Sequence, residues 1–263
     1  MSATMESTVV PAASISPARR EEMLSLMQQY FENVTRTAFL ADLAEKQWVV
    51  MLLDRQTDAL CALAENALSQ GDLSTAQLHL QAASNLLGTS ENKWLQTLVC
   101  YFRGLLAQYA GDAVTAMMLL DRVTALAREG QYRPDLARAL VALARAKRTL
   151  GQVSPASELL MEGLELFRAL GHKLGIAEAL EELGAVSAVR GDGAQAAMLL
   201  STAHALREGM GAPLPPVDRA AYDSVLAACR AQLGEAAFAE AWAHAAARSW
   251  QEVVEEVLKL RQN

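Results

Sequence analysis

Apolar side chains recur every three or four residues along most of this chain, which is the spacing that places them on one face of an α-helix. Residues 18–30 show the spacing first, through Met23, Met27 and Tyr30, and residues 37–45 repeat it. The pattern therefore predicts two helices ahead of a longer helical region.

The run from Trp48 to Leu53 is different, because it is continuously apolar and begins with an aromatic and two β-branched residues. Alone, such a run is typical of a buried strand. It also continues in helical register from Asp54 to Ser69, so it is equally well explained as the buried start of a helix. The sequence leaves these two alternatives open.

A glycine recurs every 40 residues through the middle of the chain. Each glycine is followed by an alanine after five residues and by a leucine after nine. The three sets are Gly71, Gly111, Gly151 and Gly191; Ala76, Ala116, Ala156 and Ala196; and Leu80, Leu120, Leu160 and Leu200. A fixed period of this length indicates a solenoid, in which one helical hairpin is stacked repeatedly.

Small side chains at fixed positions explain how each hairpin closes, since two antiparallel helices approach closely only where both are small. Seven residues before each glycine the chain has Ala64, Gly104, Ala144 and Gly184. Leucines such as Leu63 and Leu80 are expected to fill the space between the crossings. The glycine itself is predicted to end the first helix in the left-handed conformation, and the aspartate after it to cap the second.

This placement of small residues resembles the tetratricopeptide (TPR) repeat, with a period of 40 residues instead of the usual 34. The resemblance implies an all-α fold, a right-handed α-solenoid of TPR-like helix hairpins with terminal capping helices. We expect a flexible tail at 1–17, a cap segment at 18–55, four repeats at 56–212 and C-terminal capping helices at 213–263. Three helices are predicted in that last part, with Ser249 and Glu252 forming a capping box at the third.

The C-terminal half carries a second resemblance, through Leu180-Glu181-Glu182-Leu183-Gly184, Ala203-His204-Ala205-Leu206-Arg207 and Gly211-Ala212-Pro213-Leu214-Pro215-Pro216. Roughly residues 135–258 are similar to the end of the TPR arrays of MalT-like and LuxR-type bacterial ATPase regulators. The chain has no Gly-x-x-x-x-Gly-Lys-Ser/Thr loop, so no ATPase is expected. The resemblance implies a bacterial regulatory or scaffold protein.

Residues 18–53 loosely resemble the opening of GNAT-type acyltransferases, in which two helices lead into the first strand. The similar stretches run from Met27 to Val34, from Phe39 to Lys46 and from Trp48 to Leu52. The acetyl-CoA loop of that family, Arg/Gln-x-x-Gly-x-Gly/Ala, does not follow them. We interpret the segment as a remnant or cap, and an acyltransferase-related enzyme is the less favoured alternative.

Composition narrows the class of protein further. The net charge of −7 and the pI near 5.2 argue against sequence-independent binding of nucleic acid, which needs a basic surface. No run approaches the roughly 20 apolar residues of a membrane span. The odd number of cysteines without a Cys-x-x-Cys motif favours a reducing compartment. We therefore expect a cytoplasmic protein.

Catalytic chemistry has little support in the sequence. No pair of histidines has the spacing of metal ligands, so no catalytic residue, metal or cofactor is predicted. The adjacent Glu181 and Glu182 do not share a helix face and are interpreted as solvated charges.

Binding has better support, because certain positions of the first helices should face inward in a TPR-like array. The candidate partner-binding residues are Tyr101, Gln108, Tyr109, Arg138, Arg145, Arg148, Glu178 and Glu181. Their tyrosines and arginines suit an acidic or C-terminal peptide, since guanidiniums pair with carboxylates. In the alternative, the arginines pair with Glu178 and Glu181 and only keep the surface soluble. The sequence predicts a non-catalytic protein-interaction module, and a small-molecule sensor is the runner-up.

Overall fold

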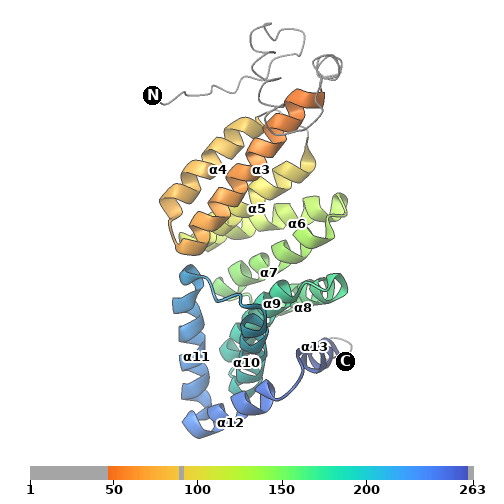
Figure 1. Cartoon of the computed structure of the whole chain (residues 1–263). Coiled ribbons are helices and arrows are strands. Elements are labelled where there is room, and N and C mark those ends of the chain that lie inside the picture. Colours follow the sequence, from red (N-terminus) through yellow and green to blue (C-terminus); the bar gives the residue numbers. More distant parts are fainter. Residues whose placement is uncertain (1–46, 89–91, 260–263) are drawn as a thin grey trace, which may run out of the picture.

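The computed structural model describes residues 47–88 and 92–259, and the side chains from Arg55 onward. All the regular elements of this part are helices, and α3 to α10 are stacked in chain order along one long axis (Figure 1). The elements are α3 (Gln47–Gln70), α4 (Leu73–Leu87), α5 (Lys93–Tyr109), α6 (Ala113–Glu129), α7 (Arg133–Thr149), α8 (Val153–Leu170), α9 (Lys173–Val189), α10 (Gly193–Met210), η2 (Pro216–Asp218), α11 (Arg219–Leu233), α12 (Glu235–Ala246) and α13 (Trp250–Lys259).

The run from Trp48 to Leu53 is helical, because α3 begins at Gln47 and continues without a break to Gln70. This settles the alternative between strand and helix in favour of the helix. The predicted tail at 1–17 and the predicted helices at 18–30 and 37–45 lie outside the described residues. The acyltransferase-like stretch also lies outside them up to residue 46.

Each turn inside a helix pair is made by one of the repeated glycines. Gly71, Gly111, Gly151 and Gly191 have φ values of +80°, +83°, +76° and +84°. Asp72 then caps α4, since its carboxylate accepts a hydrogen bond of 3.0 Å from the backbone N–H of Thr75. Asp112 and Asp192 cap α6 and α10 in the same way. Glycine at the turn is thus confirmed in these four pairs, and the aspartate cap is confirmed for α4, α6 and α10. Gln152 before α8 makes no side-chain cap hydrogen bond.

Small residues lie where the paired helices touch. The four alanines that follow the glycines by five residues are each 0% exposed: Ala76, Ala116, Ala156 and Ala196. A Cβ on Gly104 would lie 2.8 Å from Cγ of Leu120, and one on Gly184 would lie 2.9 Å from Cγ of Leu200. These leucines are buried as predicted, so small and large residues alternate across each contact.

Leu63 corrects one expectation about this packing. Its side chain is 50% exposed, whereas the equivalent Leu143 and Leu183 are buried. Elsewhere in the core, Cys61 and Cys229 are buried free thiols, and burial raises the pKa of Cys61 to about 12.

The segment after the fourth helix pair returns along the stack. The chain leaves α10, crosses the front of α7 to α9 and reaches the top of α11 near the turn between α3 and α4 (Figure 1). We call residues 211–218 the strap. The short helix η2 at its end contacts α3, and α11 then packs against α9 and α10. The strap therefore links the last helix pair with the first.

The predicted helices of the C-terminal segment are present as α11, α12 and α13. The capping box at α13 is confirmed, because Ser249 Oγ accepts from the N–H of Glu252 and Glu252 accepts from the N–H of Ser249, both at 3.3 Å. Within the described residues, no helix combines the length and the apolar character needed to cross a membrane.

Replacing Ala116 with tryptophan tests the packing at a helix crossing. The side chain has no free space around it, so the variant should lose about 1–3 kcal/mol or more of the free energy of unfolding. Val114→Trp is the matched control on the same helix, since Val114 is 53% exposed. Chemical denaturation of both variants gives the comparison, and equal stabilities would disprove the assigned crossing.

Candidate binding site

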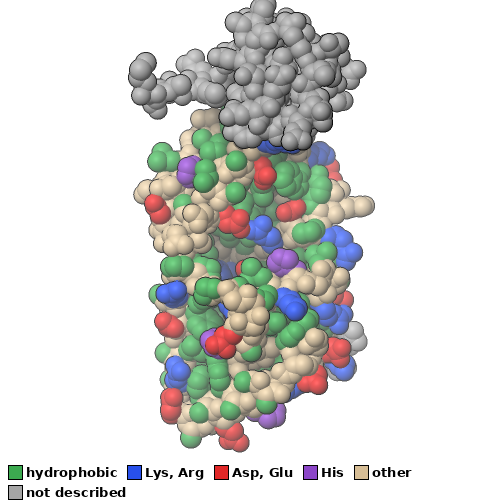
Figure 2. Space-filling view, viewed as in Figure 1, with side chains coloured by type: hydrophobic (Ala, Val, Ile, Leu, Met, Phe, Trp, Pro, Cys, Tyr) green, Lys and Arg blue, Asp and Glu red, His purple; other side chains and the backbone are tan. Residues whose placement is uncertain are grey.

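The first helix of each pair contributes to one polar cavity, of about 390 Å³, on the face that the strap crosses. We call it the inner cavity. Its wall is formed by α3, α5, α7 and α9, with Arg207 from α10 and Pro215 and Asp218 from the strap. Viewed from the same side as the fold, acidic and basic side chains are mixed over this face (Figure 2). Helical spacing of three, four and seven residues brings one side of each helix to the cavity.

Seven of the eight sequence-predicted residues line the inner cavity: Tyr101, Gln108, Tyr109, Arg138, Arg145, Glu178 and Glu181. The eighth, Arg148, is not among the lining residues and instead binds Glu182. Periodicity thus found the correct faces of α5, α7 and α9. It could not show what those side chains contact.

Ion pairs neutralise each of the arginines in the cavity wall. Arg138 binds Glu65 of α3 at 2.6 Å, and Arg145 binds Asp218 of the strap at 2.9 Å. Arg207 donates two hydrogen bonds to the carboxylate of Glu181, at 2.5 and 3.0 Å. Arg138 also lies over the ring of Tyr101, with 4.9 Å from its central carbon to the ring centre.

Glu182 is the buried partner of two arginines behind the cavity. Arg145 Nε donates to one carboxylate oxygen at 2.5 Å, and Arg148 donates to the other at 3.1 and 3.3 Å. Burial alone would raise the pKa of Glu182, but the two guanidiniums outweigh it and hold that pKa below its ordinary value. The interpretation of Glu181 and Glu182 as solvated charges was therefore wrong, because both are enclosed by arginines from neighbouring helices.

The strap is attached to the inner face through Asp218. Its carboxylate accepts a hydrogen bond from Arg145 at 2.9 Å and from the hydroxyl of Tyr109 at 3.3 Å. Nearer α10, Arg207 donates to the carbonyl oxygen of Ala212 at 3.5 Å. At the far end, Val217 lies next to Gly71 in the first turn. An acidic residue of the chain itself thus occupies the place expected for an acidic partner.

Glu178 differs from the other carboxylates of the cavity wall. No described residue donates a hydrogen bond to it, and none forms an ion pair with it within 4 Å. Burial raises its pKa above the ordinary value, and the charges of Arg207, Arg138 and Arg145 only partly oppose this effect. The side-chain oxygen Oε1 of Gln108 is also without a hydrogen-bond donor in the described part of the chain, although it is buried.

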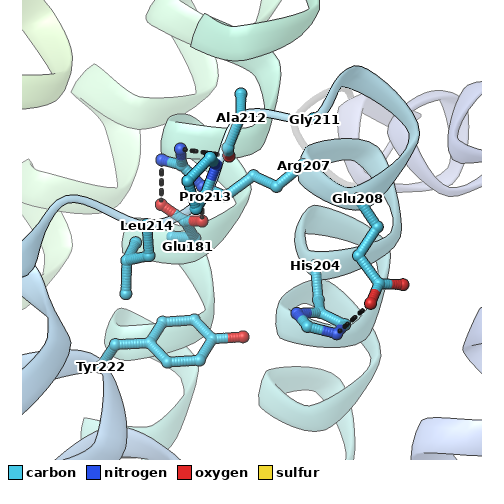
Figure 3. A pocket seen from close by; sticks show the side chains of 9 residues that line it. All are labelled: Glu181, His204, Arg207, Glu208, Gly211, Ala212, Pro213, Leu214 and Tyr222. Carbon is cyan, nitrogen blue, oxygen red and sulfur yellow. Dashed lines mark hydrogen bonds and ion pairs between the residues drawn. The ribbon is translucent and has the colours of Figure 1, made fainter.

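A second pocket, of about 420 Å³, lies on the other side of the Arg207–Glu181 pair (Figure 3). Leu214 of the strap and the ring of Tyr222 from α11 face this space, and His204 lies opposite on α10. His204 is within 3.4 Å of Glu208 one helical turn further on. The strap therefore separates two hollows and contributes to the wall of each.

Several site residues were missed from the sequence. Glu65, Glu182, Arg207 and Asp218 complete the ion pairs, but they come from different helices and from the strap. The alternative in which the arginines pair with Glu178 and Glu181 named the wrong carboxylates. Arg138 pairs with Glu65, and Arg145 and Arg148 pair with Glu182. The described residues contain no group of three or more side chains suited to a metal ion.

Neither known protein-family models nor curated proteins match this chain at a significant level.

Removing the guanidinium of Arg145 tests the buried network. Arg145→Met removes one partner from Glu182, which keeps Arg148, and one from Asp218, which keeps the hydroxyl of Tyr109. The free energy of unfolding should therefore fall by about 2 kcal/mol. Arg128→Met is the control, since its pair with Glu162 is far more exposed and should contribute under about 1 kcal/mol. Denaturant unfolding measures the stability of both variants. Equal losses would show that the buried network stabilises the fold no more than an exposed ion pair does.

The raised pKa of Glu178 leads us to expect that the stability of the fold depends on pH. Its folded-state pKa lies above the unfolded value near 4.5, so the ionised form is unfavourable in the fold. The stability linked to this group is full below the unfolded pKa and is lost as the pH rises through the folded pKa. Glu178→Gln should therefore melt higher than the wild type at neutral pH, and the difference should vanish as the pH falls toward 4.5. A difference that stays constant with pH would contradict the assignment.

Proposed function

We propose that this chain is a non-catalytic protein-interaction module, a right-handed TPR-like α-solenoid built from 40-residue units. The consecutive helix pairs, the glycine turns and the small-residue crossings support the architecture. The resemblance to the repeat arrays of bacterial regulators supports a regulatory or scaffold adaptor. The acidic composition and the unpaired cysteines favour a cytoplasmic setting without direct binding to nucleic acid.

The position of the strap across the inner face is the main support for this proposal. A segment of the chain already lies across the inner face, without regular structure at 212–215 and then as the short helix η2. Its one carboxylate, that of Asp218 in η2, is held by Arg145 and Tyr109. Repeat proteins commonly bind extended segments on such a face. A segment of another protein with the same chemistry would make the same contacts by taking the place of the strap.

The strap also indicates which chemistry the partner needs. Leu214 fills part of the second pocket, and Pro215 lines the inner cavity. Val217 packs against the first turn, and Asp218 supplies the charge. We therefore infer a partner segment that contains proline and carries a carboxylate after its apolar residues. Proline lowers the entropy cost of binding because it restricts the free segment.

A small-molecule sensor is the second candidate, and one observation favours it. The inner cavity, at about 390 Å³, falls within the usual 300–1,000 Å³ range of ligand pockets.

A strap-exchange experiment tests the main proposal. Residues 212–218 are replaced by a Gly/Ser segment of equal length, and a fluorescent peptide with the sequence of residues 211–219 is added. The variant should bind the peptide, which anisotropy measures, while the wild type should bind it much more weakly because its own strap occupies the face.

A peptide with asparagine in place of Asp218 is the matched control. It should bind about tenfold more weakly, since it loses a charge-assisted hydrogen bond. A folded variant that ignores the peptide, or binds both peptides equally, would refute the proposed recognition. If the exchanged chain does not fold, Asp218→Ala in the intact chain should instead raise the hydrogen-exchange rate of the strap, and an unchanged rate would count against it.

A further inference from the structure

The charges in the wall of the inner cavity do not balance. Its arginines, Arg138, Arg145 and Arg207, are matched one to one by Glu65, Asp218 and Glu181. Glu178 then remains as one further carboxylate in the same wall. Glu182 and Arg148 behind the wall form another matched pair and leave the difference unchanged. With neutral histidine, the cavity wall therefore carries one uncompensated negative charge.

Two acceptors of the cavity wall are without a donor in the part of the chain that the structure describes. Glu178 has no hydrogen-bond donor or ion-pair partner among the described residues, and Gln108 Oε1 is buried without a donor. Glu178 is half-buried, and the charges of Arg207, Arg138 and Arg145 act on it without a hydrogen bond. Burying an acceptor without a donor is costly, and this applies to Gln108 Oε1. The arginines of the wall donate to Glu65, Asp218 and Glu181 instead. A cation that donates hydrogen bonds would suit both the excess negative charge and the unpaired acceptors.

We propose that the inner cavity binds a small organic monocation, a primary ammonium or guanidinium group on a compact body, with Glu178 as its counter-ion. The cation would restore the charge balance of the wall and would give Glu178 the donor that it lacks. The volume of about 390 Å³ admits such a molecule, and Leu105, Val141 and Leu174 supply apolar wall for its body.

Two other ligand classes fit the wall less well. An anion would have to compete with carboxylates that already hold each arginine of the wall. A divalent metal ion prefers several oxygen or nitrogen ligands, whereas Glu178 is the one uncommitted carboxylate, and the described residues include no cluster of three metal-ligating groups.

Three probes of equal shape separate these classes: hexylamine, hexanol and hexanoate. Each is titrated into the intact protein at neutral pH, and binding is followed by NMR shifts of the amides of α5, α7 and α9. Hexylamine should bind at least about tenfold more tightly than hexanol, because it adds a charged hydrogen bond. Hexanoate should bind no better than hexanol.

Glu178→Gln keeps the shape of the side chain and removes its charge. This variant should bind hexylamine about tenfold more weakly than the wild type, to the level of hexanol. Glu240→Gln, an exposed position on α12, is the matched control and should bind as the wild type does.

The proposal is overturned if hexylamine does not bind, if it has no advantage over hexanol, or if Glu178→Gln binds it as tightly as the wild type. None of these readouts involves the strap peptide. The cavity can therefore fail this test while the recognition of a partner segment stands, and the reverse also holds.

Discussion

Close contact between paired helices at small side chains is the constraint on which this structure depends. Where Gly104 faces Leu120 and Gly184 faces Leu200, even one additional carbon atom would overlap the leucine. The glycine turn and the aspartate cap then fix where one helix ends and the next begins. Because the same contacts recur from pair to pair, corresponding faces of α5, α7 and α9 come to lie along one surface.

That surface concentrates charged side chains that are largely buried. Buried ion pairs add little net stability relative to apolar packing, but leaving one partner unpaired is strongly unfavourable. Arg145 illustrates the consequence, since it joins Glu182 of α9 to Asp218 of the strap. A displaced strap would leave Arg145 and Tyr109 in need of another acceptor. The network therefore favours one position of the strap, and it restricts replacements to segments with a carboxylate at the same point.

The sequence predicted the repeated units well because their signals are local. Glycine, aspartate and alanine at fixed spacing report turns, caps and crossings within one hairpin, and the faces carrying Tyr101, Arg138 and Glu178 follow from helical geometry alone. Partners that are distant in the chain were not predictable in this way. Asp218 lies 73 residues after Arg145 and 109 after Tyr109, and no periodic pattern marks it. Burial of Glu182 also depends on arginines from a neighbouring helix, which a rule about adjacent residues misses.

The charge pair between Arg145 and Asp218 holds the strap on the inner face. A double-mutant cycle with Arg145→Met, Asp218→Asn and the combined variant measures the coupling free energy of this pair from denaturant unfolding. A coupling of about 2 kcal/mol is expected, because both groups are largely buried and lie 2.9 Å apart. If the stability losses of the two single variants add to that of the combined variant within about 0.5 kcal/mol, this ion pair does not hold the strap on the inner face.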